Sequence, residues 1–494
     1  MKQHTIQLYP LGKKIVVNEN TPLIDVLHEY GIEFPCGGKG TCGKCKIKLL
    51  QGNIHASKDH FTKIEKLGLG IDWRLACLSK CTSDITIEVD QLSNPILADE
   101  TEFVFTPKEG YGIAVDLGTT TIVTQLIDLS DARVIAVETA INPQTKYGSD
   151  LISRIKACLE GNQLQMKELI RSAIGDMIER ILEKQKVTIK KVVIVGNTAM
   201  QLIFSGEDVS GLSVYPFFVS NTDMKQFSSN DLSWNFTVSE GVWFYPSIAS
   251  FVGSDILAGI LATGLYKKSD YVALIDLGTN GEIAIGNQDR IVCASTAAGP
   301  AFEGASITMG MRAETGAISS IDLHKGKIIT KTIGNIKPKG ICGSALIDAV
   351  TVFRKLNLIG LFGEIYSGES KISIDENIYL TQKDINEFQL AKSALATGMT
   401  ILLQNLSISK DQIKEVYIAG GFGNYINLEN VTEIGMINHP PEKIRRMGNT
   451  ALIGAKMFLF EDIELVEEIL DKTKHINLEG NPNFQDIFVD NLLI

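Results

Sequence analysis

The chain has 494 residues, of which 44% are hydrophobic and 21% charged, and this composition is typical of a globular protein with a large core. Its length predicts roughly three domains or lobes. The net charge of −11, with no cluster of Lys and Arg, argues against nucleic acid as a partner. No apolar run reaches the ~18 residues that cross a bilayer, and no signal-peptide pattern opens the sequence. We therefore expect a cytoplasmic protein with no membrane partner.

The N-terminal part of the chain predicts a small domain that mixes strands and helices. Residues 4–8 and 14–17 alternate in polarity as the two strands of a hairpin. Residues 21–27 begin with Thr-Pro and read as a capped helix. Residues 84–89 alternate again and predict a further strand.

Four cysteines of this part have the spacing of an iron-sulfur site. Cys36, Cys42 and Cys45 lie in the run FPCGGKGTCGKC, and Cys77 follows in RLAC. A glycine-rich loop can turn sharply and aim backbone N–H groups at sulfur atoms, which suits a [2Fe-2S] cluster. Cys81 is a second candidate for the fourth ligand. Buried or disulfide-bonded thiols and a zinc site are the competing readings, although the long first loop argues against a zinc ribbon.

The order of these cysteines, followed by the strand at 84–89, resembles plant and adrenodoxin-type ferredoxins. That resemblance implies an α+β domain of the β-grasp type over residues 1–92 and favours Cys77 over Cys81 as the fourth ligand. The spacing of bacterial [4Fe-4S] ferredoxins is absent.

Residues 93–110 predict a linker. They contain two prolines and show no sustained helical or strand period. A flexible tether would let the first domain move between partners. An ordinary packed connector, anchored by Phe103 and Phe105, is the equal alternative.

The rest of the chain contains an internal duplication. An apolar strand runs into the turn Asp-Leu-Gly-Thr at Asp116, in YGIAVDLGTT, and the same pattern returns at Asp276, in YVALIDLGTN. Each copy continues with two further strands and then helices. We expect two lobes, over residues 111–265 and 266–494. An amphipathic helix at 455–472 is expected to pack on the C-terminal lobe.

The chemistry of the repeated turn is that of a phosphate site. A strand delivers a carboxylate at its carboxyl end, and the glycine turn exposes N–H groups and Thr hydroxyls to phosphate oxygens. Asp116 and Asp276 would then face Mg²⁺, which prefers one or two carboxylates together with substrate phosphates. Two such turns predict a nucleotide cleft between the lobes.

A third element completes the pattern, because the strand EVYIA ends in the glycine turn Gly420 to Gly423, where a backbone can approach an adenosine closely. The set resembles the ATPase superfamily of acetate and sugar kinases, heat-shock chaperones and actin. It implies an α/β fold of two actin-like lobes of the ribonuclease H type. No GxxxxGK[ST] loop is present, so the ATP prediction depends on this resemblance.

The combination resembles the reductive activators of corrinoid-dependent enzymes over nearly the whole chain. The runs that carry the resemblance are FPCGGKGTCGKC, YGIAVDLGTTT, VIVGNTAM, LIDLGTNGEI, TAAGPAFEGA, AGGFGNYI and NPNFQDIF. It implies that ATP binding and hydrolysis drive one electron through the cluster, returning Co(II) of a corrinoid protein to Co(I). The implied partner is that corrinoid protein with its methyltransferase.

The resemblance also implies residue roles. The phosphate and Mg²⁺ loops would comprise Asp116, Gly118, Thr119, Thr120, Asp276, Gly278, Thr279, Asn280 and Glu282, and the adenosine loop Gly420, Gly421, Phe422 and Gly423, with Asn197 and Asp255 as further cleft residues. Among these, Asp116, Asp276 and Glu282 are the expected catalytic residues. Glu282 or Glu303 is the candidate that orients the attacking water.

Two features leave the partners open. No GxGxxG fingerprint follows a strand, so electrons must come from a separate donor such as a ferredoxin, a flavodoxin or a flavoprotein. Longer relatives carry an additional domain before the ATPase, which leaves the docking mode and a possible homodimer undetermined. The alternative functions are activation of another low-potential enzyme, such as a dehydratase, and redox or nucleotide sensing without catalysis.

Overall fold

The protein is described by a computed structural model. The described residues are 2–9, 13–27, 32, 40, 45–67, 69–88, 103–148, 150–278, 280–304, 306–313, 316–366, 368–420 and 426–494. Several predicted residues lie outside them: Cys36, Cys42, Thr279, Gly421, Phe422, Gly423 and residues 93–102 of the linker.

The N-terminal domain is a five-stranded sheet with two short helices. The strand order is β2 (Lys13–Asn18), β1 (Gln3–Tyr9), β7 (Ile85–Glu88), β4 (Lys46–Gln51) and β5 (Trp73–Leu75), and the helices are α1 (Ile24–Leu27) and α2 (Lys58–Lys66). The predicted hairpin is confirmed, since β1 and β2 pair antiparallel, and β7 joins β1 in parallel. Ile6, Leu8 and Ile87 form its core with no exposed surface. The helix expected from residue 21 is wrong at its start, because Thr21–Pro22 instead form the short strand β3 against β6 (Lys80–Cys81).

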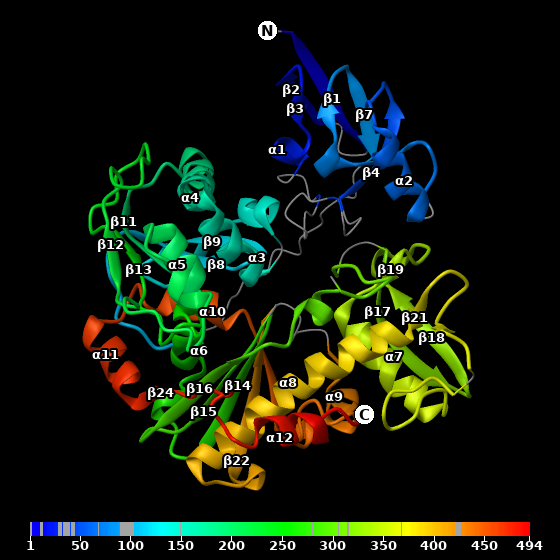
Figure 1. Ribbon diagram of the computed structural model, residues 1–494. Coiled ribbons are helices and arrows are strands. Elements are labelled where there is room, and N and C mark those ends of the chain that lie inside the picture. Colours follow the sequence, from blue (N-terminus) through cyan, green and yellow to red (C-terminus); the bar gives the residue numbers. More distant parts are fainter. Residues whose placement is uncertain are drawn as a thin grey trace.

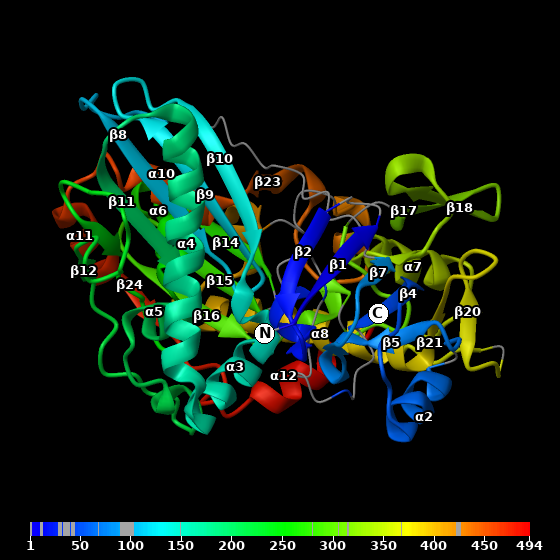
Figure 2. The ribbon, with the colours of Figure 1, turned by 90° about the horizontal axis from the view of Figure 1, so that it is seen from above.

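The first lobe contains a six-stranded sheet. Its order is β10 (Val134–Ile141), β9 (Thr121–Asp128), β8 (Tyr111–Leu117), β11 (Ile189–Gly196), β13 (Val242–Phe244) and β12 (Lys225–Phe227). The helices α3 (Leu151–Ala157), α4 (Gln163–Gln185) and α5 (Thr198–Ser205) belong to this lobe. Figure 2 shows the long α4 lying along one face of the sheet.

The second lobe repeats this topology. Its sheet has the order β23 (Ile444–Gly448), β22 (Ile413–Ala419), β14 (Tyr271–Leu277), β15 (Gly281–Gly286), β16 (Ile291–Thr296) and β24 (Thr473–His475). In both lobes the first strand pairs antiparallel with the second and parallel with the fourth. Its helices are α7 (Gly343–Lys355), α8 (Gln382–Leu406), α9 (Leu428–Glu433) and α12 (Phe484–Asp490). The predicted duplicated α/β fold is confirmed.

The second lobe also carries an inserted portion between β16 and α8. It contains β17 (Ala317–His324), β18 (Lys327–Thr332) and β19 (Gly340–Ile341) in one sheet, and the hairpin of β20 (Lys371–Ser373) and β21 (Tyr379–Thr381). This portion lies on the far side of the second lobe from α6 and α10 (Figure 1).

Two helices lie between the sheets of the lobes, α6 (Ser254–Thr263) and α10 (Thr450–Met457) (Figure 1). One apolar cluster joins them to both sheets, with Ala114 and Val195 from the first and Leu274 and Ala419 from the second. The helices touch at Gly454, where an added Cβ would lie 2.2 Å from the carbonyl oxygen of Ala258. The single helix expected at 455–472 is wrong in its bounds. The segment breaks into α10 and α11 (Ile463–Lys472), and α10 begins earlier, at Thr450. The expected packing on the C-terminal lobe is confirmed, since α11 contacts β24, and α10 also contacts the sheet of the first lobe.

The C-terminal part of the linker is packed. The rings of Phe103 and Phe105 lie 5.6 and 4.9 Å from that of Phe460. The ammonium of Lys108 donates to the carbonyl oxygen of Leu459 at 3.2 Å. Residues 103–110 are therefore a packed connector.

We predict that Gly454→Ala destabilises the protein, because the new Cβ has no room against the backbone of Ala258. The expected loss is about 1–3 kcal/mol of unfolding free energy, seen as a lower Tm in thermal denaturation. Gly480→Ala is the matched control, since its Cβ would approach no atom more closely than 3.5 Å. Equal Tm values for the two variants would contradict this account of the helix contact.

Candidate functional site

The duplicated strands bring Asp116 and Asp276 to the junction of the two lobes. Each is the penultimate residue of its strand, β8 or β14, and each keeps partial exposure while the strand residues around it are buried. The side chain of Asn449, which caps α10, donates to Asp116 Oδ2 at 2.7 Å. A residue of the C-terminal half of the chain thus fixes the carboxylate of the first lobe.

The turn after β8 is held by two carboxamides. Asn142 Nδ2 donates to the carbonyl oxygen of Gly118 at 2.9 Å, and Asn197 Nδ2 donates to Thr119 Oγ1 at 2.9 Å. Gly118 is required at this turn, since a Cβ would lie 2.7 Å from the carbonyl oxygen of Thr121. In the second copy the N–H of Gly278 donates to the carbonyl oxygen of Asn280 at 3.0 Å. These turns have the tight form that a phosphate cradle requires.

Four carboxylates gather at this junction. Asp276 stands directly opposite Glu282 in the β14–β15 ladder, where side chains of a pair share one face. Asp255 lies in the first turn of α6. Burial raises the pKa of Asp116 to about 6 and those of Asp255 and Asp276 to about 7. Repulsion from Asp116 adds to the pKa shift of Asp255, and repulsion from Asp255 and Asp116 adds to that of Asp276. The pKa of Glu282 is also raised well above its usual value, by burial and then by Asp255 and Asp276.

The carboxylates of this arrangement could hold a hydrated Mg²⁺. Among the described residues, no three His, Cys, Asp or Glu side chains approach closely enough to hold a metal ion. Mg²⁺ usually keeps several waters and takes one or two carboxylates, so carboxylates that repel one another without converging suit it. Asp116 and Asp276 are the pair that the duplication presents for this role.

Gly420 begins its turn beside Asp276. Its φ is +88°, and an added Cβ would lie 2.5 Å from the carbonyl oxygen of Leu277 and 2.8 Å from Asp276 Oδ1. Only glycine fits here. The structure therefore brings the start of the predicted adenosine loop next to the second phosphate turn.

In the N-terminal domain the structure brings Cys45 and Cys77 together. Their sulfur atoms lie 3.1 Å apart, well beyond the 2.03–2.05 Å of a disulfide bond. Cys81 is buried in β6, where its thiol donates to the carbonyl oxygen of Ser83 at 3.4 Å. Burial raises the pKa of the Cys81 thiol, which disfavours the thiolate that binds metal. The adjacent sulfur atoms of Cys45 and Cys77 fit two ligands of one cluster.

The N-terminal domain contacts the first lobe through an ion pair. Lys146, in the short turn Pro143–Tyr147, donates to Asp25 Oδ1 in α1 at 3.1 Å. Figures 1 and 2 place the domain over the region between α3 and the sheet of β17 and β19.

Comparisons with known proteins agree with this architecture. Three family models match the chain: the 2Fe-2S iron-sulfur cluster binding domain at residues 6–82, the RACo middle region at 111–268 and the C-terminal ASKHA domain of RACo at 270–494. The corrinoid activation enzyme RamQ of Eubacterium limosum is 30% identical, with 98% of both chains covered. This chain belongs to the RACo family of corrinoid activators.

Two further relatives support the assignment. The [Co(II) methylated amine-specific corrinoid protein] reductase of Methanosarcina barkeri is 26% identical over 75% of this chain and 73% of its own. A solved structure titled reductive activator for corrinoid, iron-sulfur protein superposes with a TM-score of 0.70 at 27% identity, covering 99% of this chain and 98% of that chain. The RamQ alignment spans 585 positions, so that relative has residues with no counterpart among the 494 here. Among the described residues of this RACo-family chain, no helix is both long and apolar enough to span a bilayer.

Sequence reasoning missed three residues at the junction of this RACo-family chain. Asn449 binds Asp116, and Asn142 binds the turn that follows it. Each asparagine also caps the helical turn after it, and the pairs Asn449-Thr450 and Asn142-Pro143 are the sequence signals of these caps. Arg154 of α3 is fully buried, and burial lowers its pKa to about 9, while the charges of Asp150 and Glu303 favour the charged form. No sequence pattern marks it.

The raised carboxylate pKa values predict a pH dependence. The folded state holds protons that the unfolded chain releases between about pH 4 and 7, so the stability of metal-free protein falls as pH rises through this window. Mg²⁺ is expected to raise Tm more at pH 8 than at pH 5, because only ionised carboxylates bind it. Thermal denaturation in EDTA and in Mg²⁺ measures both effects, and an equal Mg²⁺ shift at the two pH values would refute the carboxylate site.

The cysteine geometry predicts different outcomes for two neighbouring substitutions. Cys77→Ser should abolish the visible absorbance of a reconstituted [2Fe-2S] cluster, since it removes a thiol beside Cys45. Cys81→Ser is the matched control and should retain the spectrum. The reverse result would make Cys81 the ligand.

Proposed function

We propose that this protein is an ATP-dependent reductive activator that returns Co(II) of a corrinoid protein to Co(I). The supporting observation is the combination of two parts on one chain. A ferredoxin-type domain with two adjacent thiols is joined to a duplicated ATPase fold with carboxylates at the junction of its lobes. The chain also aligns over 98% of its length with a corrinoid activation enzyme.

In this proposal Asp116 and Asp276 hold Mg²⁺ through its waters, and the turns at Gly118 to Thr120 and Gly278 to Asn280 receive the phosphates. The glycine loop from Gly420 to Gly423, with Phe422, receives the adenosine. Asn197 and Asp255 line the nucleotide cleft between the lobes. Glu282 or Glu303 orients the attacking water, because hydrolysis requires a positioned water and little covalent chemistry.

Asn449 gives the nucleotide a way to act on the lobes. Its amide N–H points at Asp116 Oδ2, a direction that repels a cation at the same oxygen. A hydrated Mg²⁺ at Asp116 would therefore share this carboxylate with Asn449, whose side-chain oxygen also caps α10. ATP can drive a change only by binding two conformations differently, and in this proposal the Asn449–Asp116 contact is the one that would differ between them.

The electron path begins in the N-terminal domain. A [2Fe-2S] cluster held by Cys36, Cys42, Cys45 and Cys77 would supply one electron at a time. Each 100 mV by which the corrinoid lies below the cluster costs about 2.3 kcal/mol per electron, which ATP binding and hydrolysis would offset. Electrons would come from a separate ferredoxin, flavodoxin or flavoprotein. The partner would be a corrinoid protein with its methyltransferase, and a homodimer is compatible with this scheme.

The test is an anaerobic visible spectrum of a Co(II) corrinoid protein mixed with catalytic amounts of this protein and a low-potential reductant, with and without ATP. The Co(I) band should appear only with ATP. Asp276→Asn should reduce its rate of appearance at least a hundredfold while leaving the cluster spectrum intact. Asp270→Asn, at the exposed residue before the same strand, is the matched control and should behave as wild type.

Other results would contradict the proposal in different ways. Unchanged activation by Asp276→Asn would refute the assigned role of the carboxylates. Co(I) formation without ATP would contradict the proposed coupling of reduction to ATP. A third outcome is that no Co(I) forms under any condition and that a corrinoid protein does not stimulate ATP turnover. This outcome would favour activation of a different enzyme, or a role as a redox or nucleotide sensor.

A further inference from the structure

A cavity of about 570 Å³ lies in the second lobe, away from the carboxylate junction. Its walls come from the end of α7, the middle of α8, the segment after α9 and the residues that follow α12. Ile413 at the start of β22 lines it, whereas Gly420 follows the other end of that strand. At about 3.3 Å per residue, the strand places the cavity roughly 20 Å from the proposed nucleotide site.

The cavity is cationic although the whole chain carries a charge of −11. Arg354, Lys355, Lys392 and Lys410 line it. Glu433 is the one acidic side chain among the described lining, and Ile494, the last residue of the sequence, adds its α-carboxylate. Glu433 is already paired with Lys355, at 2.7 Å. Three cations are left without a described carboxylate partner in the cavity.

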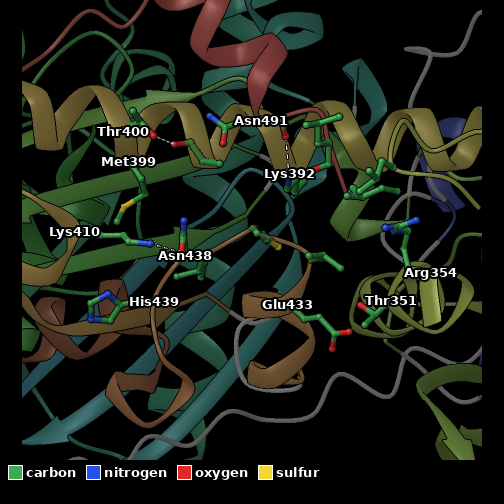
Figure 3. A pocket seen from close by; sticks show the side chains of 18 of the residues that line it. Thr351, Arg354, Lys392, Met399, Thr400, Lys410, Glu433, Asn438, His439 and Asn491 are labelled. Carbon is green, nitrogen blue, oxygen red and sulfur yellow. Dashed lines mark hydrogen bonds between the residues drawn. The ribbon is translucent and has the colours of Figure 1, made fainter.

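Lys392 is the most buried of these cations, with 3% of its surface exposed. Its ammonium donates to the carbonyl oxygens of Asn491 and Leu493, and the first of these contacts is drawn in Figure 3. A lysine has three donors, so one remains. Burial alone lowers the pKa of Lys392 to about 8, with no carboxylate to offset the cost of burying the charge.

Arg354 lies on the same side of the cavity as Lys392, as Figure 3 shows. One of its guanidinium nitrogens donates to the carbonyl oxygen of Ile359 at 3.0 Å. A guanidinium has five donors, and the others suit the oxygens of a carboxylate or phosphate.

The opposite side of the cavity presents an imidazole that is hydrogen-bonded to the backbone of Ile413 but has one unpaired nitrogen. His439 is 6% exposed, and its Nε2 atom has no hydrogen-bond partner among the described residues. Figure 3 shows it beside Asn438 and Lys410, whose side chains are hydrogen-bonded at 3.0 Å. Buried polar atoms are nearly always paired, so this one indicates a missing partner. Met399 and Leu403 of α8 supply an apolar wall.

We propose that this cavity binds a small organic anion, with its carboxylate or phosphate group on Arg354 and Lys392, its apolar body against Met399 and Leu403, and a polar group at His439. The volume lies within the range of sites for small molecules. The site is distinct from the proposed nucleotide site and does not depend on it.

The test is isothermal titration of the full chain with phenyl phosphate and with benzoate, in the presence of a saturating non-hydrolysable ATP analogue and Mg²⁺, so that the nucleotide site is filled. Benzyl alcohol is the uncharged control. At least one anion should bind, and benzyl alcohol should bind at least tenfold more weakly. Binding of phenyl phosphate alone assigns a phosphate ligand, and binding of benzoate alone assigns a carboxylate.

Two cavity variants, Arg354→Gln and Met399→Trp, and one control locate the binding. Arg354→Gln should weaken it at least tenfold, whereas Arg133→Gln, at an exposed position of the first lobe, should leave it unchanged. Met399→Trp should abolish binding by filling the cavity, and its Tm shows whether the fold is retained. The proposal is overturned if neither anion binds wild type, or if both variants bind the anion as wild type does.

Discussion

The contact between α6 and α10 is the constraint on which the rest of the molecule depends. These helices fill the apolar space between the two sheets, and they approach so closely at Gly454 and Ala258 that no side chain fits between them. Both helices begin at the carboxylate junction, where Asp255 lies in the first turn of α6 and Asn449 caps α10. The packing that joins the lobes therefore also sets the geometry of the site. A change in that geometry must be accommodated by this core or by rotation about it.

The junction concentrates negative charge at a cost to stability. Burial raises the pKa values of Asp116, Asp255, Asp276 and Glu282, and repulsion from neighbouring aspartates raises those of Asp255, Asp276 and Glu282 further. The positive ends of two helix dipoles and the amide of Asn449 offset part of the repulsion. A cation bound as proposed would offset more of this repulsion. The large cores of both lobes tolerate such a local cost.

As a member of the RACo family, this chain carries both a ferredoxin-type domain and an ATPase fold. The ion pair between Asp25 and Lys146 is partly exposed, and pairs of this kind contribute at most about 1 kcal/mol. It is small beside the apolar core that joins the lobes. Phe103 and Phe105 pack against that same core, so the connector is anchored there from residue 103 onward.

The sequence by itself determined the fold class, the duplication and the residues that could carry chemistry, because these depend on local patterns: alternation in β8 and β14, glycine at a turn, and cysteine spacing. Only the tertiary structure decided what those residues meet. Asn449 and Asp116 are remote in the chain, Arg154 is buried without a motif, and the cavity around Lys392 is built from five separate segments. The helix expected at 455–472 failed for the same reason. Its amphipathic period was visible, but the break after Met457 and the contact of α10 with both sheets arise from packing between segments that no local pattern encodes.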